Sequence, residues 1–278
     1  SVGILGIEND LGAGLEKRMG CWLYPELKLL GFERSASNAV ATYAVGDFAK
    51  VTMEYIFNTD GSLTVTETLS DVKPGTPDMF RFGIEFALDG ALDGISFYGL
   101  GPWENYPDRN SSAMLGLYSQ KVEDQYHHGF VRPQESGTHA DLSWLSVADN
   151  ARNGLLVQAP EKFLGSALPF GRKDIDMFVS GGGRSDHGDQ RHSLELKTLV
   201  HEGERSLGQT WVNLDLCQMG LGCITSWGDL PRQEYMVPAG DYEFTFRGDE
   251  HFPKSRVKLA EQLLSRQLNA ILSREALY

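Results

Sequence analysis

The sequence predicts an all-β protein built as an antiparallel sandwich, and three observations lead to that prediction. Several short segments alternate apolar and polar side chains, which is the period of a strand with one buried face. These segments are rich in Thr, Val, Tyr and Phe, the residues that fit a pleated surface. The 31 glycines and 11 prolines fall mostly between the segments, where the chain must turn. Many short strands joined by turn-rich loops are typical of an antiparallel sandwich.

The clearest predicted hairpin spans residues 50–69. Residues 50–57 alternate, and their apolar members share one face: Val51, Met53, Tyr55 and Phe57. Asp60-Gly61 follows and predicts a tight turn, because glycine accepts a positive φ. Leu63, Val65 and Leu69 then alternate with threonines. The same alternation predicts three further strands, at 80–86, 211–216 and 242–246.

Two stretches do not fit the strand pattern. Residues 181–192 are rich in glycine and polar side chains and predict a mobile loop. Residues 254–278 predict a helix, because apolar side chains recur at steps of three and four after Pro253. We therefore expect a β-sandwich domain over residues 1–250 and a C-terminal helical extension over residues 251–278, packed on the sandwich through its apolar stripe.

Composition and charge narrow the possible partners. The chain has 278 residues with 25 Lys and Arg against 38 Asp and Glu, so its formal net charge is −13. This balance repels polyphosphate and anionic lipid, so we expect neither nucleic acid nor a membrane as a partner. A neutral ligand such as a sugar is unaffected by it. No apolar run approaches the ~20 residues that a helix needs to cross a bilayer.

Cysteine and histidine give no metal motif. An odd number of cysteines without Cys-x-x-Cys spacing predicts buried free thiols at Cys21, Cys217 and Cys223. Four acid–base side chains lie close together in sequence: His127, His128, Glu135 and His139. They lack the spacing of metal motifs, which favours solvated or hydrogen-bonded histidines. A second set of possible metal ligands has a loose metal-like spacing: His187, Asp189 and His192. It lies in the predicted loop, which is not rigid enough to favour a metal site.

Three segments combine polar, aromatic and glycine residues, as binding loops do. In residues 98–109, a pairing of Glu104 or Asp108 with Arg109 is the structural alternative to a loop that lines a cleft. Residues 218–229 follow a predicted strand and contain Trp227, which suits either the apolar face of a sugar ring or a place in the core. Residues 7–14 form either a binding loop or a plain surface turn.

These three segments, in this order, resemble the C-terminal domain of family-two β-galactosidases, which are large glycoside hydrolases. The run Tyr-Gly-Leu-Gly-Pro-Trp-Glu-Asn-Tyr-Pro-Asp-Arg at 98–109 looks like that domain's Gly-x-Gly-Pro-x-Glu-Asn-Tyr-Pro-Asp-Arg signature. The signature residues of this loop are Glu104, Tyr106, Asp108 and Arg109. The resemblance spans roughly residues 5–247, with further matches at 8–12, 133–137, 166–170 and 218–228.

The resemblance implies a supersandwich similar in fold to galactose mutarotase, which packs against a catalytic barrel domain and completes its sugar site. Trp227 matches an active-site Trp that forms an apolar wall for the galactoside, and Asn9 and Asp10 match a loop at the mouth of that site. The sequence departs from the family at Cys223-Ile224, where a Gly-Asp pair is usual, and at Thr138-His139, where Asn-Arg is usual. The opening strands of such a domain would precede Asn9.

The resemblance also implies that the chemistry lies elsewhere. Retaining glycosidases need two carboxyl groups about 5–5.5 Å apart, and in this family both stand on a (β/α)₈ barrel. No alternation of strands and helices is present in this sequence, so we assign no catalytic residue to it, including Glu8, Glu104 and Glu135. The divalent cation of such enzymes would also lie on the barrel, so neither a metal nor another cofactor is expected in this chain.

We therefore expect a domain that completes the site for hydrolysis of terminal β-D-galactosides and is inactive alone, with the barrel domain and a homo-oligomer as implied partners. Two alternatives stay open. One is a free-standing mutarotase-like aldose epimerase that uses His139 and Glu135 as an acid–base pair. The other is a carbohydrate-binding module. The chain starts at Ser1 with neither an initiator Met nor a signal peptide, which indicates a fragment and leaves the compartment open.

Overall fold

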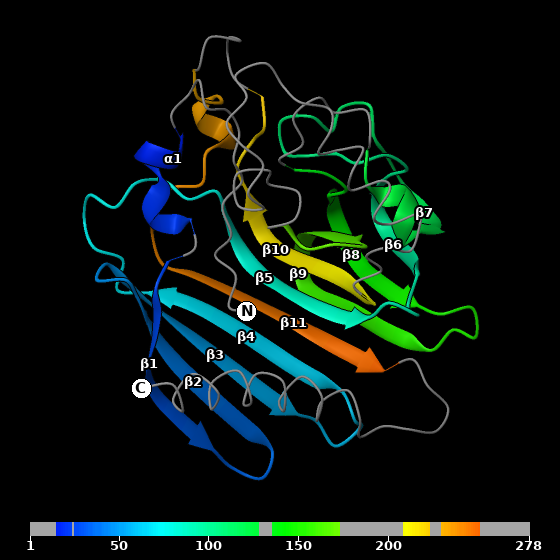
Figure 1. The fold of residues 1–278 in the computed structure, drawn as a ribbon, viewed down its shortest axis with the longest axis horizontal. Coiled ribbons are helices and arrows are strands. Elements are labelled where there is room, and N and C mark those ends of the chain that lie inside the picture. Colours follow the sequence, from blue (N-terminus) through cyan, green and yellow to red (C-terminus); the bar gives the residue numbers. More distant parts are fainter. Residues whose placement is uncertain (1–14, 24, 128–134, 173–207, 223–228, 251–278) are drawn as a thin grey trace.

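The computed structural model describes residues 15–23, 25–127, 135–172, 208–222 and 229–250 (Figure 1). Within these ranges eleven strands pair, all of them antiparallel, in one branched sheet. The predicted all-β antiparallel class is thereby confirmed. The predicted loop at 181–192 and the predicted helical extension at 251–278 lie outside the described residues.

The helical elements are short and the strands carry the fold. No helix in the described ranges is long and apolar enough to span a membrane. Along the chain the elements are α1 (Leu15–Arg18), η1 (Gly20–Trp22), β1 (Leu27–Arg34), β2 (Asn38–Val45), β3 (Ala49–Phe57), β4 (Leu63–Ser70), β5 (Arg81–Asp89), β6 (Gly94–Gly101), β7 (Met114–Lys121), η2 (Val122–Gln125), β8 (His139–Ala148), β9 (Gly154–Leu168), β10 (Gln209–Gln218), η3 (Gln233–Tyr235) and β11 (Tyr242–Glu250).

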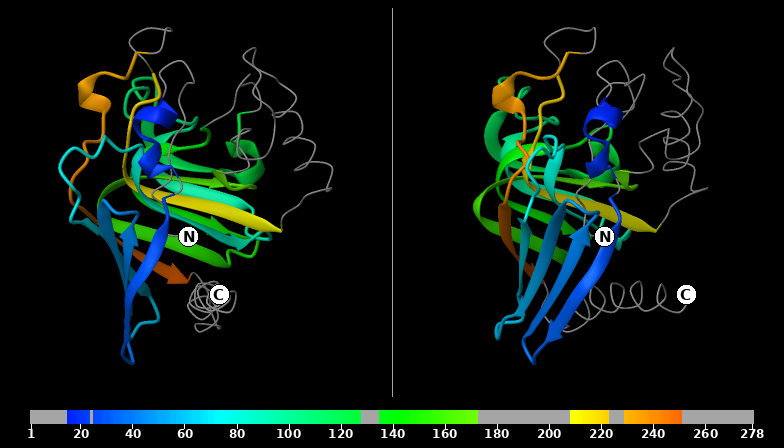
Figure 2. Two further views of the ribbon diagram at one scale, coloured as in Figure 1. Left: turned by 60° about the vertical axis from the view of Figure 1, so that its left-hand side comes forward. Right: turned by 90° about the vertical axis from the view of Figure 1, so that its left-hand side faces the viewer.

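The long strand β9 joins two layers of the sheet. β1, β2, β3, β4 and β11 follow one another in the first layer, and β5, β10, β8, β6 and β7 belong to the second. Residues 155–158 of β9 pair with β11, whereas residues 164–168 pair with β10. The strands of the first layer run across those of the second in Figure 2. One strand therefore serves both layers and fixes their relative position.

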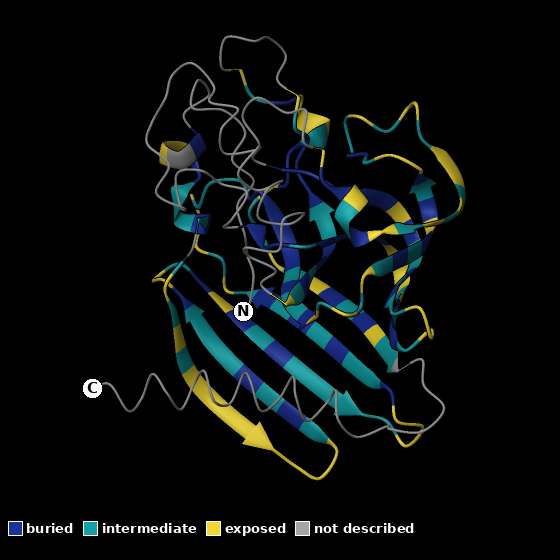
Figure 3. Ribbon diagram, turned by 45° about the vertical axis from the view of Figure 1, so that its right-hand side comes forward, coloured by how far each residue is buried: buried dark blue, intermediate teal, exposed yellow. Residues whose placement is uncertain are grey.

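Apolar side chains from both layers form one core. The predicted inner face of the first hairpin is buried at Val51, Met53, Val65 and Leu69, each at most 4% exposed. Across the layers, the rings of Phe163 on β9 and Phe244 on β11 lie 6.4 Å apart. The alternation of buried and less buried residues along the first-layer strands is visible in Figure 3. The predicted period-two pattern is therefore confirmed in β3, β4 and β11.

Strands β5 and β10 depart from this pattern because both of their faces are covered. Their apolar members enter the core, but the polar members are also at most 5% exposed: Arg81, Glu85, Asn213 and Asp215. Gly83 makes the pairing possible, since a Cβ there would lie 2.1 Å from the carbonyl oxygen of Leu214 and 2.5 Å from Cα of Asp215. Both contacts are to backbone atoms, so a side chain at this position has no room.

We predict that Gly83→Ala lowers the free energy of unfolding by about 3 kcal/mol, because the added methyl group forces two paired strands apart. Urea denaturation followed by circular dichroism measures this change. Gly31→Ala on β1 is the matched control, since a Cβ there meets nothing within 4 Å. Equal midpoints for the two variants would contradict the prediction.

Candidate functional site

The loop between β6 and β7 carries the signature residues, and Asn105 at its centre attaches it to β8. The side-chain amide of Asn105 donates to the carbonyls of Leu100 at 2.9 Å and of Trp103 at 3.1 Å. Its Oδ1 accepts the N–H of Ala140 at 3.0 Å. Asn105 is only 1% exposed, and hydrogen bonds shielded from water hold a loop firmly. The loop is thus a fixed part of the scaffold.

Glu104 connects this loop to the segment before β8. Its Oε2 accepts the hydroxyl of Ser136 at 3.0 Å and the N–H of Gly137 at 2.8 Å. Its Oε1 accepts Nη2 of Arg109 at 2.8 Å, so the predicted pairing of these two charges is present. The guanidinium of Arg109 lies 4.9 Å from the ring centre of the fully buried Tyr106. Burial raises the pKa of Tyr106 well above its usual range, so its phenol stays neutral.

Asp108 connects the same loop to the segment that comes after β10. Its Oδ2 accepts the N–H of Gly222 at 2.6 Å. Gly220 leaves room for this carboxylate, because a Cβ there would lie 2.7 Å from Cγ of Asp108. The N–H groups of Met219 and Gly220 donate to the carbonyls of Phe80 and Tyr235, both at 2.8 Å. Residues 219–222 are therefore fixed by three neighbouring segments.

The predicted substrate-binding residues Trp227, Asn9 and Asp10 lie outside the described residues, so their roles stay predictions. Residue 222 is the last described position before Trp227 in the sequence. The structure thus places the signature loop against the backbone that leads to the predicted sugar-binding Trp. Of the predicted free thiols, Cys21 and Cys217 are free and partly exposed, and Cys223 lies outside the described residues.

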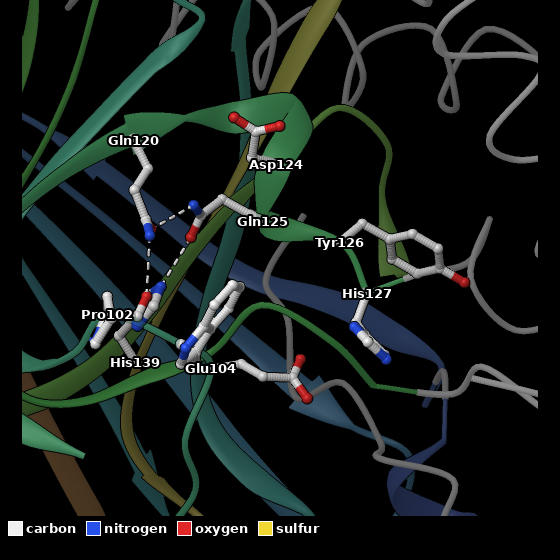
Figure 4. A pocket seen from close by; sticks show the side chains of 9 residues that line it. Pro102, Glu104, Gln120, Asp124, Gln125, Tyr126, His127 and His139 are labelled. Atoms are coloured by element: carbon white, nitrogen blue, oxygen red, sulfur yellow. Dashed lines mark hydrogen bonds between the residues drawn. The ribbon is translucent and has the colours of Figure 1, made fainter. Parts of the chain in front are cut away.

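A pocket of about 370 Å³ opens beside the signature loop. It is lined by Pro102, Trp103, Glu104, Gln120, Asp124, Gln125, Tyr126, His127 and His139. Figure 4 shows a hydrogen-bonded row in its wall. Gln120 Nε2 donates to the carbonyl of Pro102 at 3.1 Å, and Gln125 Nε2 donates to Gln120 Oε1 at 2.8 Å. Sequence spacing alone did not reveal this row, because its members come from β7, η2 and β8.

His139 ends this row in a buried, uncharged state. Its Nε2 lies 2.8 Å from Oε1 of Gln125 and donates to it, since the amide nitrogen of Gln125 is already turned toward Gln120. The imidazole is 1% exposed and stacks on Phe97, with ring centres 4.1 Å apart. Burial lowers the pKa of His139 to about 4. The ring is therefore a neutral hydrogen-bonding group at neutral pH.

A second polar group, which the sequence did not predict, is a buried cluster of four ionisable side chains. Arg81 lies 3.3 Å from Glu135 and 3.4 Å from Asp215. Arg172 also contacts both carboxylates, and all four side chains are at most 7% exposed. Burial raises the pKa of Glu135 to about 7 and that of Asp215 to about 6, against the opposing charge of Arg81. The cluster links β5, β10, the segment after β9 and the segment before β8.

Hydrogen bonds from neighbouring side chains reach two members of the cluster, Glu135 and Arg172. Among the described residues, Nε of Arg81 and Oδ2 of Asp215 have no hydrogen-bond partner. Thr138 Oγ1 donates to Glu135 Oε1 at 3.0 Å. Arg172 donates through Nε to Asn213 at 2.6 Å and through its backbone N–H to Glu85 at 3.0 Å. Desolvation offsets most of the attraction in a buried ion pair, so such a cluster fixes positions more than it adds stability.

The two residues considered for an epimerase belong to different groups. Glu135 bonds the arginines and Thr138, whereas His139 bonds Gln125. No hydrogen bond joins them, and both side chains are almost fully buried. The described residues therefore do not offer them as an exposed acid–base pair. Within the same ranges, no group of three His, Cys, Asp or Glu residues is placed to hold a metal ion.

We predict a pH-dependent contribution of His139 to stability. Its folded pKa of about 4 lies below the unfolded value of 6.5, so the unfolded state binds the proton first as the pH falls. The free energy of unfolding of the wild type, minus that of His139→Gln, should rise by about 3 kcal/mol between pH 4 and pH 6.5. Urea titrations across this range measure the difference, and a constant difference would refute a buried neutral imidazole.

Comparison with known proteins gives relatives that are longer than this chain. A β-galactosidase from Streptococcus thermophilus is 28% identical over 249 residues, which cover 86% of this chain and 22% of the relative. The β-galactosidase BgaC of Bifidobacterium adolescentis is 29% identical over 245 residues, which cover 84% of this chain and 21% of the relative. This chain thus spans about a fifth of the length of these relatives.

Solved structures similar to this one include mutarotase-related proteins. A galactose mutarotase related enzyme from Lactobacillus acidophilus gives a TM-score of 0.35 at 9% identity, covering 84% of this chain and 74% of that chain. An aldose epimerase homologue from C. elegans gives a TM-score of 0.37 at 8% identity, covering 82% of this chain and 70% of that chain. Both TM-scores are below 0.5, so the assignment of a sandwich rests on the strand pairing of this chain.

The family comparison agrees with the signature loop. Residues 7–247 match the model of a family described as "Beta galactosidase small chain". This range contains the three segments that carried the sequence resemblance, together with every described strand as far as Arg247 of β11. The chain therefore belongs to the β-galactosidase small chain family.

Proposed function

We propose that this chain is the part of a β-galactosidase that completes the sugar-binding site for hydrolysis of terminal β-D-galactosides. One observation carries the proposal: the family match covers residues 7–247, while the chain spans about a fifth of its β-galactosidase relatives. In this proposal the catalytic carboxyl pair and a divalent cation stand on a barrel domain elsewhere in the enzyme, and the whole enzyme can assemble as an oligomer.

The geometry of the signature loop supports a role in recognition. Asp108 holds Gly222, and the chain reaches Trp227 five residues later. In this proposal the indole of Trp227 forms an apolar wall for the C–H face of galactose, and Asn9 and Asp10 supply polar contacts at the mouth of the site. Positioning of this kind matters because small displacements of a binding wall lower transition-state affinity strongly.

The buried carboxyl groups support a chain without its own hydrolytic pair. Glu135 and Asp215 are committed to two arginines, and Glu104 accepts hydrogen bonds from Ser136, Gly137 and Arg109. A retaining glycosidase needs one carboxylate free to attack the sugar and a second group free to donate a proton. The signature loop and the cluster behave as scaffold in this respect.

We predict that Trp227→Ala in the full-length enzyme lowers kcat/KM for a galactoside by about 10- to 100-fold without abolishing turnover, because it removes a binding wall and leaves the carboxyl pair intact. Trp227→Phe, which keeps an aromatic face, should retain most of the activity. Steady-state kinetics on a chromogenic galactoside measure both. Unchanged kinetics in Trp227→Ala, or hydrolysis by the isolated 278-residue chain, would overturn the proposal.

We also predict that Asp108→Ala lowers kcat/KM of the full-length enzyme by about tenfold, because residues 219–222 lose a charge-assisted hydrogen bond that positions the segment leading to Trp227. Asp241→Ala removes the same charge from an exposed position with little structural consequence and serves as the control. Thermal melts of both variants show whether the effect is local. A kinetic loss of equal size in the two variants would argue against positioning by Asp108.

A further inference from the structure

We infer that the pocket beside the signature loop is a second carbohydrate site, which holds one or two neutral sugar rings against Trp103. The inference rests on residues that the structure describes and does not depend on Trp227. It is therefore independent of the proposed role in β-galactoside hydrolysis.

Trp103 supplies the surface for stacking. It is 78% exposed, the highest value among the exposed large hydrophobic side chains of the described residues. Its backbone is nevertheless fixed, because the carbonyl of Trp103 accepts from Asn105 and the carbonyl of the preceding residue accepts from Gln120. An aromatic face displayed by a rigid loop costs little ordering entropy on binding. Such a face suits the C–H patch of a sugar ring.

The hydrogen-bonded row supplies oriented polar groups beside that face. Gln120 keeps one amide hydrogen and one lone pair after the bonds of the row are made. Gln125 keeps only a lone pair on Oε1, because its Nε2 also donates to the carbonyl of Lys121 at 3.4 Å. Their orientation is set in advance by the carbonyl of Pro102 at one end and by His139 at the other. Ring hydroxyls both donate and accept, so they match such a mixed wall.

Charge and size define the class of ligand. Glu104 and Asp124 are the charged residues among those that line the pocket, and the buried imidazole of His139 is neutral at pH 7. Like charges therefore disfavour sugar acids and sugar phosphates. A volume of about 370 Å³ is at the small end of the range for ligand pockets, ~300–1,000 Å³. A neutral monosaccharide or disaccharide is the ligand that fits.

A protein partner is the competing occupant. Exposed apolar side chains on β6 and β7 offer an area for such a partner: Tyr98, Met114, Leu115 and Leu117. Leu115 and Leu117 lie an odd number of residues from Gln120, so they are on the opposite face of β7 from the pocket. A protein interface would use this apolar area but has no need of an amide row inside a hollow. The row therefore favours the sugar, and a sugar titration of matched variants distinguishes the two occupants.

The test is titration of the ¹⁵N-labelled chain with lactose, with galactose 6-phosphate as the anionic probe. We expect lactose at millimolar concentration to shift the indole N–H signal of Trp103, which is assigned by its loss in Trp103→Ala. We expect galactose 6-phosphate to have little effect on this signal. Affinity for lactose should fall about tenfold or more in Trp103→Ala and several-fold in Gln120→Ala. Phe32→Ala, which removes another exposed aromatic ring on β1, should leave it unchanged.

Three results would overturn the inference. The first is the absence of any Trp103 shift with lactose. The second is a lactose response that Trp227→Ala abolishes and Trp103→Ala does not, which would support the proposed function and reject a second site. The third is unchanged sugar affinity in Trp103→Ala together with weakened association with the remainder of the enzyme, which would identify a protein interface.

Discussion

The position of the signature loop depends on the buried charge cluster. Two guanidinium groups and two carboxyl groups hold β5, β10, the segment after β9 and the segment at Glu135 in one arrangement. Because removal of one member of a buried ion pair leaves an uncompensated charge, the arrangement has few alternatives. Ser136 and Gly137 follow Glu135 directly and bind Glu104. From there Asp108 reaches Gly222, so a continuous set of contacts connects the cluster to the predicted sugar-binding segment.

This arrangement suits the proposed role, in which the chain supplies sugar recognition to an enzyme whose chemistry lies on another domain. A sandwich of paired strands is rigid, and loops held at its edge carry binding groups without moving them. The charges of the cluster are used to hold backbone segments and are shielded from any substrate. Membership of the β-galactosidase small chain family and the short span relative to its relatives fit this division of labour.

The two ends of the signature loop have different surroundings. Asp108 contacts the backbone after β10, whereas Trp103 and Glu104 border the pocket formed with β7, η2 and β8. Asn105 lies between them and fixes both ends to the scaffold. A single fixed loop can therefore serve the proposed catalytic sugar site on one side and the inferred second sugar site on the other.

The antiparallel class, the strands around the Asp60-Gly61 turn and the family could all be predicted from the sequence, because alternation and a specific loop motif are local in the chain. The folded arrangement was needed to show that Arg81 and Asp215 are buried, that Gln120, Gln125 and His139 form one row, and that Glu135 and His139 have separate partners. Periodicity tells which side chains share a face of a strand. Which residues pack on that face depends on segments distant in sequence, and only folding brings those segments together.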